Sequence, residues 1–188
     1  RLPNGCFVRT RRRAGMRCMI LRLPHLTKPA DLIRIVEASH CTTLQIQDLV
    51  TPEDIAEVRE ALPYLRIVKA VHVMDASAVA MAKYFADAAD AILLDTRMAD
   101  RIDGTGIPHD WNINARIVER CPVPVILAGG LTSENVVEAV CRVRPYAVDV
   151  HTGVIKNGVR DAKRTMAVCC KLQELFLITL LPWDGCSF

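Results

Sequence analysis

Residues 123–143 read VPVILAGGLTSENVVEAVCRV, in which an apolar run, a pair of glycines and a segment of helical periodicity follow one another. The apolar run from Val123 to Ala128 is typical of a strand that is covered on both faces of its sheet. Ser133 stands shortly before the helical segment, residues 136–143, and is a candidate cap. These residues therefore predict one βα unit with a glycine turn between strand and helix.

Units of this kind recur along the chain. Six β-rich runs are spaced 25, 24, 25, 34 and 22 residues apart. They begin near Arg17, Thr42, Arg66, Ala91, Val125 and Ala147. Amphipathic segments between them predict helices over residues 31–38 and 55–61, with Thr27 and Thr51 as candidate caps. Because a parallel strand is reached only through a crossover, the alternation predicts an α/β fold. An eight-unit barrel of this pitch needs about 200 residues, and the six β-rich runs predict that about six units are present here.

The composition excludes several classes of protein. The chain has 188 residues, of which 51% are hydrophobic and 24% charged, so disordered and fibrous classes are ruled out. No apolar run approaches the length of a membrane span. The net charge of +3 comes from residues 1–30, which hold eight basic and no acidic side chains, against 16 basic and 21 acidic side chains in the remainder. We therefore expect no nucleic-acid and no membrane partner.

The run of arginines between Arg9 and Arg13 leaves alternatives open. It is compatible with a nuclear or nucleic-acid patch, or with part of an arginine-rich transit segment. The absence of an initiator Met and of regular periodicity before Met16 favours a cut or poorly defined terminus instead. We therefore treat residues 1–15 as a basic segment outside the predicted domain.

Eight cysteines are present, and none forms a C-x-x-C pair. They lie mostly within apolar runs. This pattern predicts free, buried thiols and a reducing, cytoplasmic location, rather than disulfides or a zinc site.

Polar and glycine residues follow three of the predicted strands, where α/β proteins place their chemistry. Asp95 comes directly after Ala-Ile-Leu-Leu and is suited to general acid catalysis, although an aspartate there is also a common helix cap or loop anchor. The loop after it contains Gly104-Thr-Gly106, which by itself indicates only a turn. Glycine turns at Gly129-Gly130 and at 150–153 (Val-His-Thr-Gly) together favour a phosphate site over two tight turns.

Four segments carry a resemblance to the phosphoribosylanthranilate isomerase family. They are Leu94-Asp-Thr96, Gly104-Thr-Gly-Ile-Pro-His-Asp-Trp111, Pro124–Leu131 with Glu134-Asn-Val136, and Arg144–Val154. Leu44-Gln-Ile-Gln-Asp48 resembles the family's Q-L-H-G segment more weakly. The resemblance implies a TIM (βα)₈-barrel isomerase domain over residues 16–174 that lacks its first two strands, with an unmatched apolar tail at 175–188.

The resemblance further implies an Amadori rearrangement in tryptophan biosynthesis, in which N-(5′-phosphoribosyl)anthranilate becomes 1-(2-carboxyphenylamino)-1-deoxyribulose 5-phosphate. No cofactor and no metal is implied. An acid protonates the ribose ring oxygen, and a base then removes the C2′ proton. By motif match Asp95 is the catalytic acid. The implied substrate-binding and phosphate-binding residues are Gln45, Gly104, Gly106, Gly129, Gly130, Asp149, His151, Thr152 and Gly153.

The chain also departs from the family pattern. The family's cysteine base, in a K-I-C-G strand, and its substrate-binding arginine, in a P-R-Y segment, are both unmatched. Cys6 lies too close to the strand at Arg17, and Cys18 aligns with the third barrel strand, so we expect neither to be the base. His151 and Thr152 replace a serine-like pair.

Three further titratable residues near the predicted site are not expected to be catalytic. Asp103 stands where the family commonly has a glycine, which is expected to alter the loop beside Asp95. His72 is expected at the rim of the site. His109 is expected to be structural.

Three interpretations follow. The chain is an isomerase represented by an incomplete sequence, a catalytically impaired phosphate-binding homologue, or another phosphosugar barrel enzyme of the indole-glycerol-phosphate or ribulose-phosphate type. The match around Asp95 disfavours the third. An incomplete barrel exposes sheet edges and its interior, so we expect homo-oligomers or other association through those edges, or poor solubility.

Overall fold

The computed structural model describes residues 7–13, 16–23, 26–47, 49–95 and 111–178, and the side chains from Leu26 to Leu175 within those ranges. One sheet has the strand order β1-β2-β3-β4-β5-β6-β7. Its strands are β1 (Phe7–Arg13), β2 (Met16–Leu23), β3 (Thr43–Ile46), β4 (Arg66–His72), β5 (Ala91–Asp95), β6 (Val125–Ala128) and β7 (Ala147–Val148). The helices are α1 (Pro29–Ser39), α2 (Pro52–Ala61), α3 (Ser77–Ala86), α4 (Trp111–Arg120), α5 (Val136–Val143) and α6 (Ala162–Ile178). A 3₁₀ turn, η1 (Thr152–Val154), and a ribbon of β8 (Ile155–Lys156) and β9 (Val159–Arg160) connect β7 to α6.

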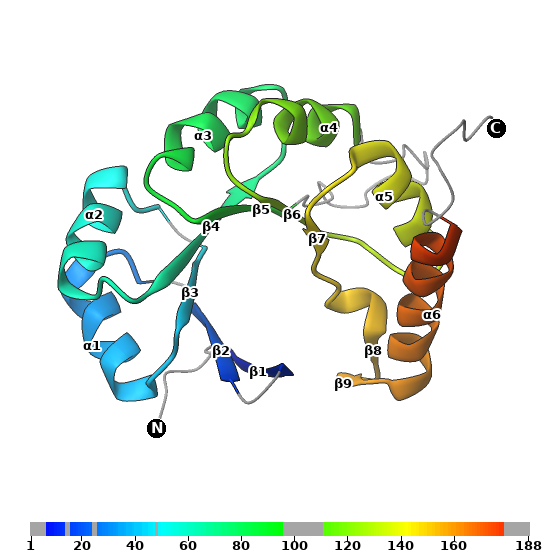
Figure 1. Cartoon of the computed structure of the whole chain (residues 1–188), viewed down its shortest axis with the longest axis horizontal. Coiled ribbons are helices and arrows are strands. Elements are labelled where there is room, and N and C mark those ends of the chain that lie inside the picture. The colour runs from blue at the N-terminus through cyan, green and yellow to red at the C-terminus, as the bar shows by residue number, and fades with distance from the viewer. Residues whose placement is uncertain (1–6, 14–15, 24–25, 48, 96–110, 179–188) are drawn as a thin grey trace.

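The sheet is parallel from β2 to β7 and curves into an arc with the helices on its convex side (Figure 1). The six predicted β-rich runs correspond to these six strands, so the predicted α/β class is confirmed. Each of the first three crossovers is a helix that follows its strand directly, which is the connection that parallel pairing requires.

Strand β1 was not predicted. It pairs antiparallel with β2 from Phe7 opposite Arg22 to Arg13 opposite Met16, so only two residues connect the strands. The arginines between Arg9 and Arg13 conceal the strand, because they replace the alternation of apolar and polar residues by a run of charge. The domain boundary at residue 16 thus falls within a hairpin, and the boundary at 174 falls within α6. The domain limits themselves stay a prediction.

The helix starts differ in how they are capped. Thr51 caps α2 as predicted: its Oγ1 accepts from the backbone N–H of Asp54 at 3.1 Å, and the Asp54 carboxylate accepts from the Thr51 N–H at 2.7 Å. For α1 the predicted cap is wrong, since Lys28 occupies that position without a side-chain bond and Pro29 sets the first turn. For α5 the cap position is Asn135 rather than Ser133.

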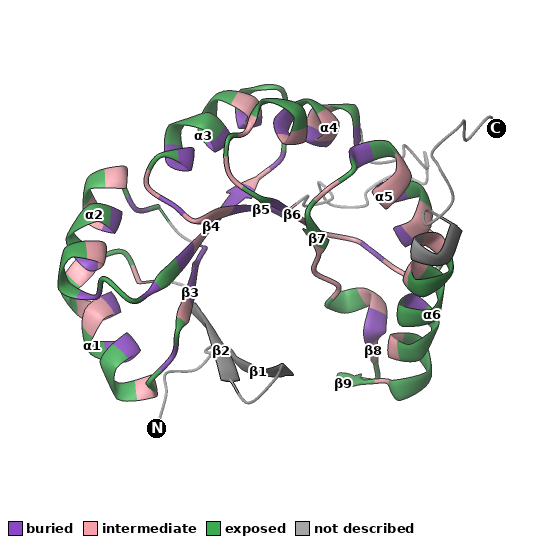
Figure 2. Cartoon of the chain, in the orientation of Figure 1, coloured by how far each residue is buried: buried purple, intermediate pink, exposed green. Residues whose placement is uncertain are grey.

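Two apolar clusters cover the two faces of the sheet. The larger one packs residues such as Ile67, Ile92 and Leu127 against the helices, and Figure 2 shows buried positions on both the strands and the helices. The smaller one, on the concave face, contains Ala70, Leu93 and Ala128, with Val68 and Ile126 against it. Each fully buried aliphatic side chain contributes about 1.5–3 kcal/mol, so the helix side of the sheet holds most of the stabilising burial.

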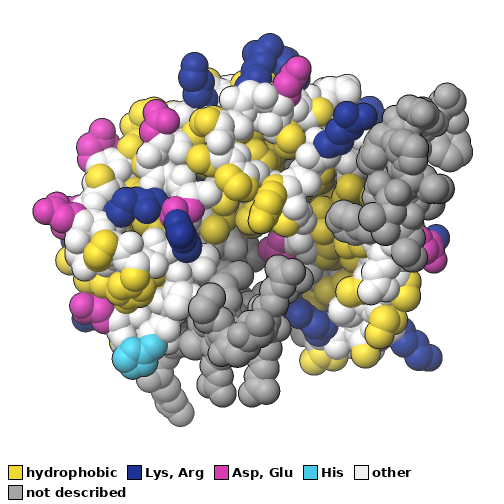
Figure 3. All heavy atoms as spheres, in the orientation of Figure 1, with side chains coloured by type: hydrophobic (Ala, Val, Ile, Leu, Met, Phe, Trp, Pro, Cys, Tyr) yellow, Lys and Arg dark blue, Asp and Glu magenta, His cyan; other side chains and the backbone are white. Residues whose placement is uncertain are grey.

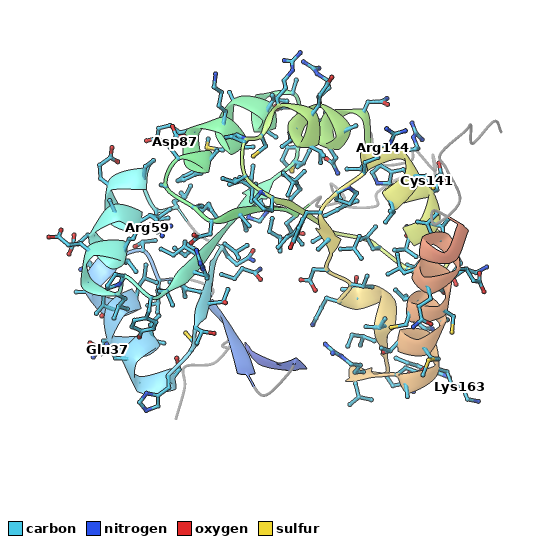
Figure 4. All side chains as sticks on the ribbon, in the orientation of Figure 1. Glu37, Arg59, Asp87, Cys141, Arg144 and Lys163 are labelled. Atoms are coloured by element: carbon cyan, nitrogen blue, oxygen red, sulfur yellow. The ribbon has the colours of Figure 1, made fainter. Side chains whose placement is uncertain are left out.

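An ion cluster joins α2 to the amino-terminal ends of β4 and β5. Arg59 extends from α2 toward the sheet (Figure 4), and its guanidinium donates to Asp90 at 3.0 Å; Arg66 donates to the same carboxylate at 3.1 Å. Asp90 also accepts from the backbone N–H of Ile67 at 2.8 Å. Burial alone would raise the pKa of Asp90, but these three donors outweigh it and hold the pKa below its usual value. The ionised form of Asp90 therefore stabilises the fold.

The cysteine prediction is only partly right. The described cysteines are free. Cys41 is buried just before the start of β3, and this burial raises the pKa of its thiol. Cys169 and Cys170 are exposed on α6, contrary to the prediction, because the buried side of that helix is formed around Val168. Among the described helices, none has the length and apolar content that crossing a membrane would require.

Candidate active site

A cavity of about 230 Å³ opens at the carboxyl-terminal ends of the strands. It is lined by Gln45, Leu93, Asp95, Ala128, Gly129, Gly130, Leu131, Asp149, His151 and Thr152. Seven of these were singled out from the sequence: Gln45, Asp95, Gly129, Gly130, Asp149, His151 and Thr152. The structure thus brings together residues that β3, β5, β6 and β7 hold far apart in the sequence. Gly153 lies directly beside the lining residues, whereas Gly104 and Gly106 fall outside the described part of the chain.

Asp95 is the last residue of β5 and is in register with His72 of β4 on one side and Ala128 of β6 on the other. Because side chains alternate between the faces of a strand, it shares the concave face with Leu93. Its side chain is 20% exposed. The carboxyl group is therefore fixed at the cavity wall beside an apolar floor.

The turn after β6 places two glycines against the cavity. Gly129 and Gly130 have φ angles of 88° and 61°, a left-handed conformation that other residues rarely adopt. The side chain of Asn135 fastens this turn, since its Nδ2 donates to the Gly130 carbonyl at 3.0 Å and its Oδ1 accepts from the Thr132 N–H at 2.8 Å. Backbone can thus approach a bound group closely here, and the turn is held in that shape.

The sequence places Asn135 in a motif and at a helix start, and it does not predict that its side chain stabilises the glycine turn. The available signal was its position five residues after Gly130, at the start of a helix, where an Asn side chain commonly bonds to nearby backbone.

The turn after β7 packs directly on the turn after β6. A Cβ atom at Gly153 would overlap the carbonyl oxygen of Leu131, so only glycine permits this approach. The Asp149 N–H donates to the Leu127 carbonyl at 2.8 Å, which continues the pairing of β7 with β6 beyond the strand. His151 and Thr152 are consequently held at the same edge of the cavity as Gly129 and Gly130.

Two buried glutamines on β3 and just after it provide amide donors. Gln45 is 7% exposed and Gln47 is 9% exposed, and the Nε2 atom of each has no hydrogen-bond partner within the described structure. Burying an unbonded amide N–H costs free energy, so such groups indicate a site for a ligand or water. Gln45 lines the cavity, whereas Gln47 was not predicted as a site residue.

His72 and the cysteines were also considered for the site from the sequence, and their positions relative to the cavity differ. His72 ends β4 next to Asp95 and is half-buried, which agrees with the predicted rim position. Cys18 lies in the first half of β2, four residues before Arg22, which is in register with Gln45. It is therefore near the opposite end of the sheet from Asp95. None of the five cysteines with described side chains lines the cavity.

Cys6, Asp103 and His109 lie outside the described residues. Within the described part of the chain, no group of three His, Cys, Asp or Glu side chains is placed to hold a metal ion.

Comparisons with known proteins agree with this geometry. The family model described as N-(5′-phosphoribosyl)anthranilate (PRA) isomerase matches residues 28–170. The N-(5′-phosphoribosyl)anthranilate isomerase of Methanocella arvoryzae is 40% identical over 126 residues, which cover 67% of this chain and 59% of that protein. The chain thus spans about three fifths of the length of the curated relatives it matches.

Solved structures give the same result. Phosphoribosyl anthranilate isomerase from Thermococcus kodakaraensis is 29% identical with a TM-score of 0.63, covering 79% of this chain and 71% of that one. The Thermotoga maritima enzyme is 24% identical with a TM-score of 0.69, over 82% of this chain and 72% of that one, and supports the fold alone. These likenesses confirm the predicted barrel-type fold.

Proposed function

Because the chain belongs to the N-(5′-phosphoribosyl)anthranilate isomerase family, we propose that it acts in tryptophan biosynthesis on N-(5′-phosphoribosyl)anthranilate. The reaction is the Amadori rearrangement to 1-(2-carboxyphenylamino)-1-deoxyribulose 5-phosphate. The observation that supports this proposal most directly is that Asp95 and the two packed glycine turns line one cavity. An acid and a phosphate site at these positions would both lie within reach of one small sugar phosphate, which supports the proposal.

We propose that the substrate phosphate binds between the turn at Gly129-Gly130 and the turn at 151–153. The left-handed glycines and the close packing of Gly153 on Leu131 bring backbone to the cavity edge without intervening side chains. Backbone N–H groups in such turns bind anions well. The Thr152 hydroxyl and the His151 ring supply further donors at the same edge.

Asp95 is the proposed general acid. Its proton goes to the ribose ring oxygen, which opens the ring and leaves a Schiff base at C1′. We propose that Gln45 and Asp149, which line the same cavity, bind the sugar or the anthranilate, and that the buried Gln45 amide gains a partner by doing so. Each of these roles is performed by a side chain or a turn of this chain, and the proposed reaction uses no metal or cofactor.

The presence of a catalytic base distinguishes the proposal from its alternative, a phosphate-binding homologue with impaired catalysis. Cys18 is not proposed as the base, because its register places it near the far end of β2 and a base must reach the C2′ proton at the cavity. Gly104 and Gly106, predicted to contact substrate, stay a prediction.

The remaining proposals concern partners and location. We propose a small-molecule phosphoribosyl substrate, no nucleic-acid partner, and self-association along the sheet edges. On the face shown in Figure 3, basic and acidic side chains are interspersed, which supports the proposal of no nucleic-acid partner. A cytoplasmic location is the proposal that the free cysteines support.

The test is rescue of a tryptophan auxotroph that lacks this isomerase, by the chain and by its Asp95→Asn variant. We expect rescue by the chain and none by the variant. Failure of both, together with inorganic phosphate binding at Gly129-Gly130 seen by NMR, would establish the phosphate-binding alternative. Rescue by the Asn variant would remove Asp95 from the role of acid.

A further inference from the structure

A histidine beside the proposed acid supports an inference that rests on the proposed function and deepens it. His72 ends β4, Asp95 ends β5, and the two residues are partners in the parallel register. His72 shares the concave face of the sheet with Ala70, as Asp95 shares it with Leu93. The Nδ1 atom of His72 lies 3.8 Å from Oδ2 of Asp95, which makes an ion pair when the ring is protonated.

We propose that His72 is a positioning residue that acts through Asp95 by sharing one proton with it. The side chains of His72 and Asp95 are 34% and 20% exposed, whereas the Nδ1 atom of His72 that faces Asp95 is buried. When the pair holds one proton, that proton is either on the imidazole or on Asp95. Because the ring Nδ1 faces Oδ2 of Asp95, a protonated His72 can pass its proton to that carboxyl group.

The proton balance is as follows. The Nδ1 proton of His72 passes to Oδ2 of Asp95, and Asp95 gives its proton to the ribose ring oxygen. The bond from C1′ to that oxygen breaks, its electron pair goes to the oxygen, and the anthranilate nitrogen lone pair forms the Schiff base. His72 is left neutral with its remaining proton on Nε2, and the pair regains a proton from water at the partly exposed Asp95 carboxyl group. A side-chain rotation must first shorten the 3.8 Å separation to a hydrogen bond of about 2.8 Å.

The surroundings of the pair favour this assignment. On the β3 side the concave face presents the neutral amide of Gln45, and beyond β5 the cavity holds Asp149 and His151 as further titratable groups. Lys69 lies on the other face of β4, where its Nζ donates to the Ala70 carbonyl and lies 4.9 Å from the centre of the Phe85 ring.

In the loop after β4, Asp75 accepts from the Ser77 N–H at 2.7 Å. Asp95 is thus the carboxylate that the described structure places within ion-pair distance of His72.

The first measurement is independent of activity. The ring resonances of His72 are followed by NMR as a function of pH in the chain and in its Asp95→Asn variant. Loss of the carboxylate removes the favourable charge, so we expect the titration midpoint of His72 to move to lower pH in the variant. An unchanged midpoint would overturn the shared proton.

The second measurement is the pH dependence of conversion of N-(5′-phosphoribosyl)anthranilate by the chain, by His72→Asn, and by a matched control, His40→Asn. His40 is exposed at the end of α1 with φ of 51°, a conformation that Asn adopts readily. For His72→Asn we expect kcat at pH 7 to fall about tenfold or more, KM to change little, and the alkaline limb to move to lower pH. The control is expected to match the chain.

The outcomes separate the two proposals. A chain without activity at any pH contradicts the proposed function, and the NMR titration then decides the His72 proposal by itself. An active chain whose pH profile is unchanged by His72→Asn contradicts the His72 proposal and leaves the proposed function standing. If His72→Asn does not fold, as judged by circular dichroism, His72→Gln takes its place.

Discussion

Replacing Gly153 by alanine perturbs the contact that holds the two glycine turns together. The added Cβ would overlap the carbonyl oxygen of Leu131 and lie 3.0 Å from both its carbonyl carbon and Cα of Thr132. All three neighbours are backbone atoms, so no side chain can rotate away and the turns must separate. Overpacking of this kind costs about 1–3 kcal/mol, which lowers Tm by roughly 2–4 °C per kcal/mol in a chain of this size.

The assay has two readouts, thermal unfolding and the affinity for inorganic phosphate measured by NMR titration. Because the turns at Gly129-Gly130 and at 151–153 must converge on the anion, we expect Gly153→Ala to weaken phosphate binding at least about tenfold, or 1.4 kcal/mol. Gly158→Ala is the matched control: its φ is 78°, and a Cβ there meets nothing within 4 Å. It should cost about 1–2 kcal/mol of backbone strain and leave phosphate affinity unchanged. Equal phosphate affinities for Gly153→Ala and the unaltered chain would refute the reasoning.

Three further predictions concern stability and thiol reactivity. Asp90→Asn should cost about 1.5–3 kcal/mol at pH 7, because three donors lose an ionised acceptor. The pKa of Asp90 is lowered in the folded chain, so its stabilisation is present above the usual aspartate pKa and is lost as pH falls through the folded value. Urea unfolding from pH 7 down to pH 3 should therefore show that the difference in free energy of unfolding between Asp90→Asn and the unaltered chain becomes smaller. Cys41, buried and with a raised pKa, should resist iodoacetamide at pH 8 while exposed Cys169 is alkylated, as peptide mass spectrometry would show; equal labelling would contradict its burial. Thr51→Ala should lower the free energy of unfolding by about 1 kcal/mol through loss of the capping box, whereas Thr27→Ala, which removes no cap, should leave it unchanged.

The strand-to-helix alternation could be predicted because it depends on local periodicity. Apolar runs such as Ala91–Leu94 and the glycine turn after Ala128 mark a strand and its end within a few residues. Strand β1 could not be predicted in the same way, since its arginines give no periodic signal and its place depends on pairing with β2. The exposure of Cys169 and Cys170 on α6 was likewise not predicted, because residues distant in the sequence decide which face of a helix is buried.

The candidate site was predictable to the extent that it follows strand ends. Parallel strands bring their carboxyl ends to one edge, so Asp95, Gly130 and Asp149 had to converge. What the sequence could not show is how that edge is held together. The Asn135 brace, the contact of Gly153 with Leu131 and the distance from His72 to Asp95 all depend on side-chain and loop geometry that no spacing encodes.

The measurement that tests the central claim most directly is the conversion of N-(5′-phosphoribosyl)anthranilate by the purified chain, beside Asp95→Asn. A general acid contributes about 10²- to 10⁴-fold to rate, so the account predicts measurable turnover by the chain and a loss of at least 100-fold in the variant, with binding of inorganic phosphate retained by both. Equal turnover by the two proteins would contradict the assignment of Asp95, and no turnover by either would contradict the isomerase activity itself.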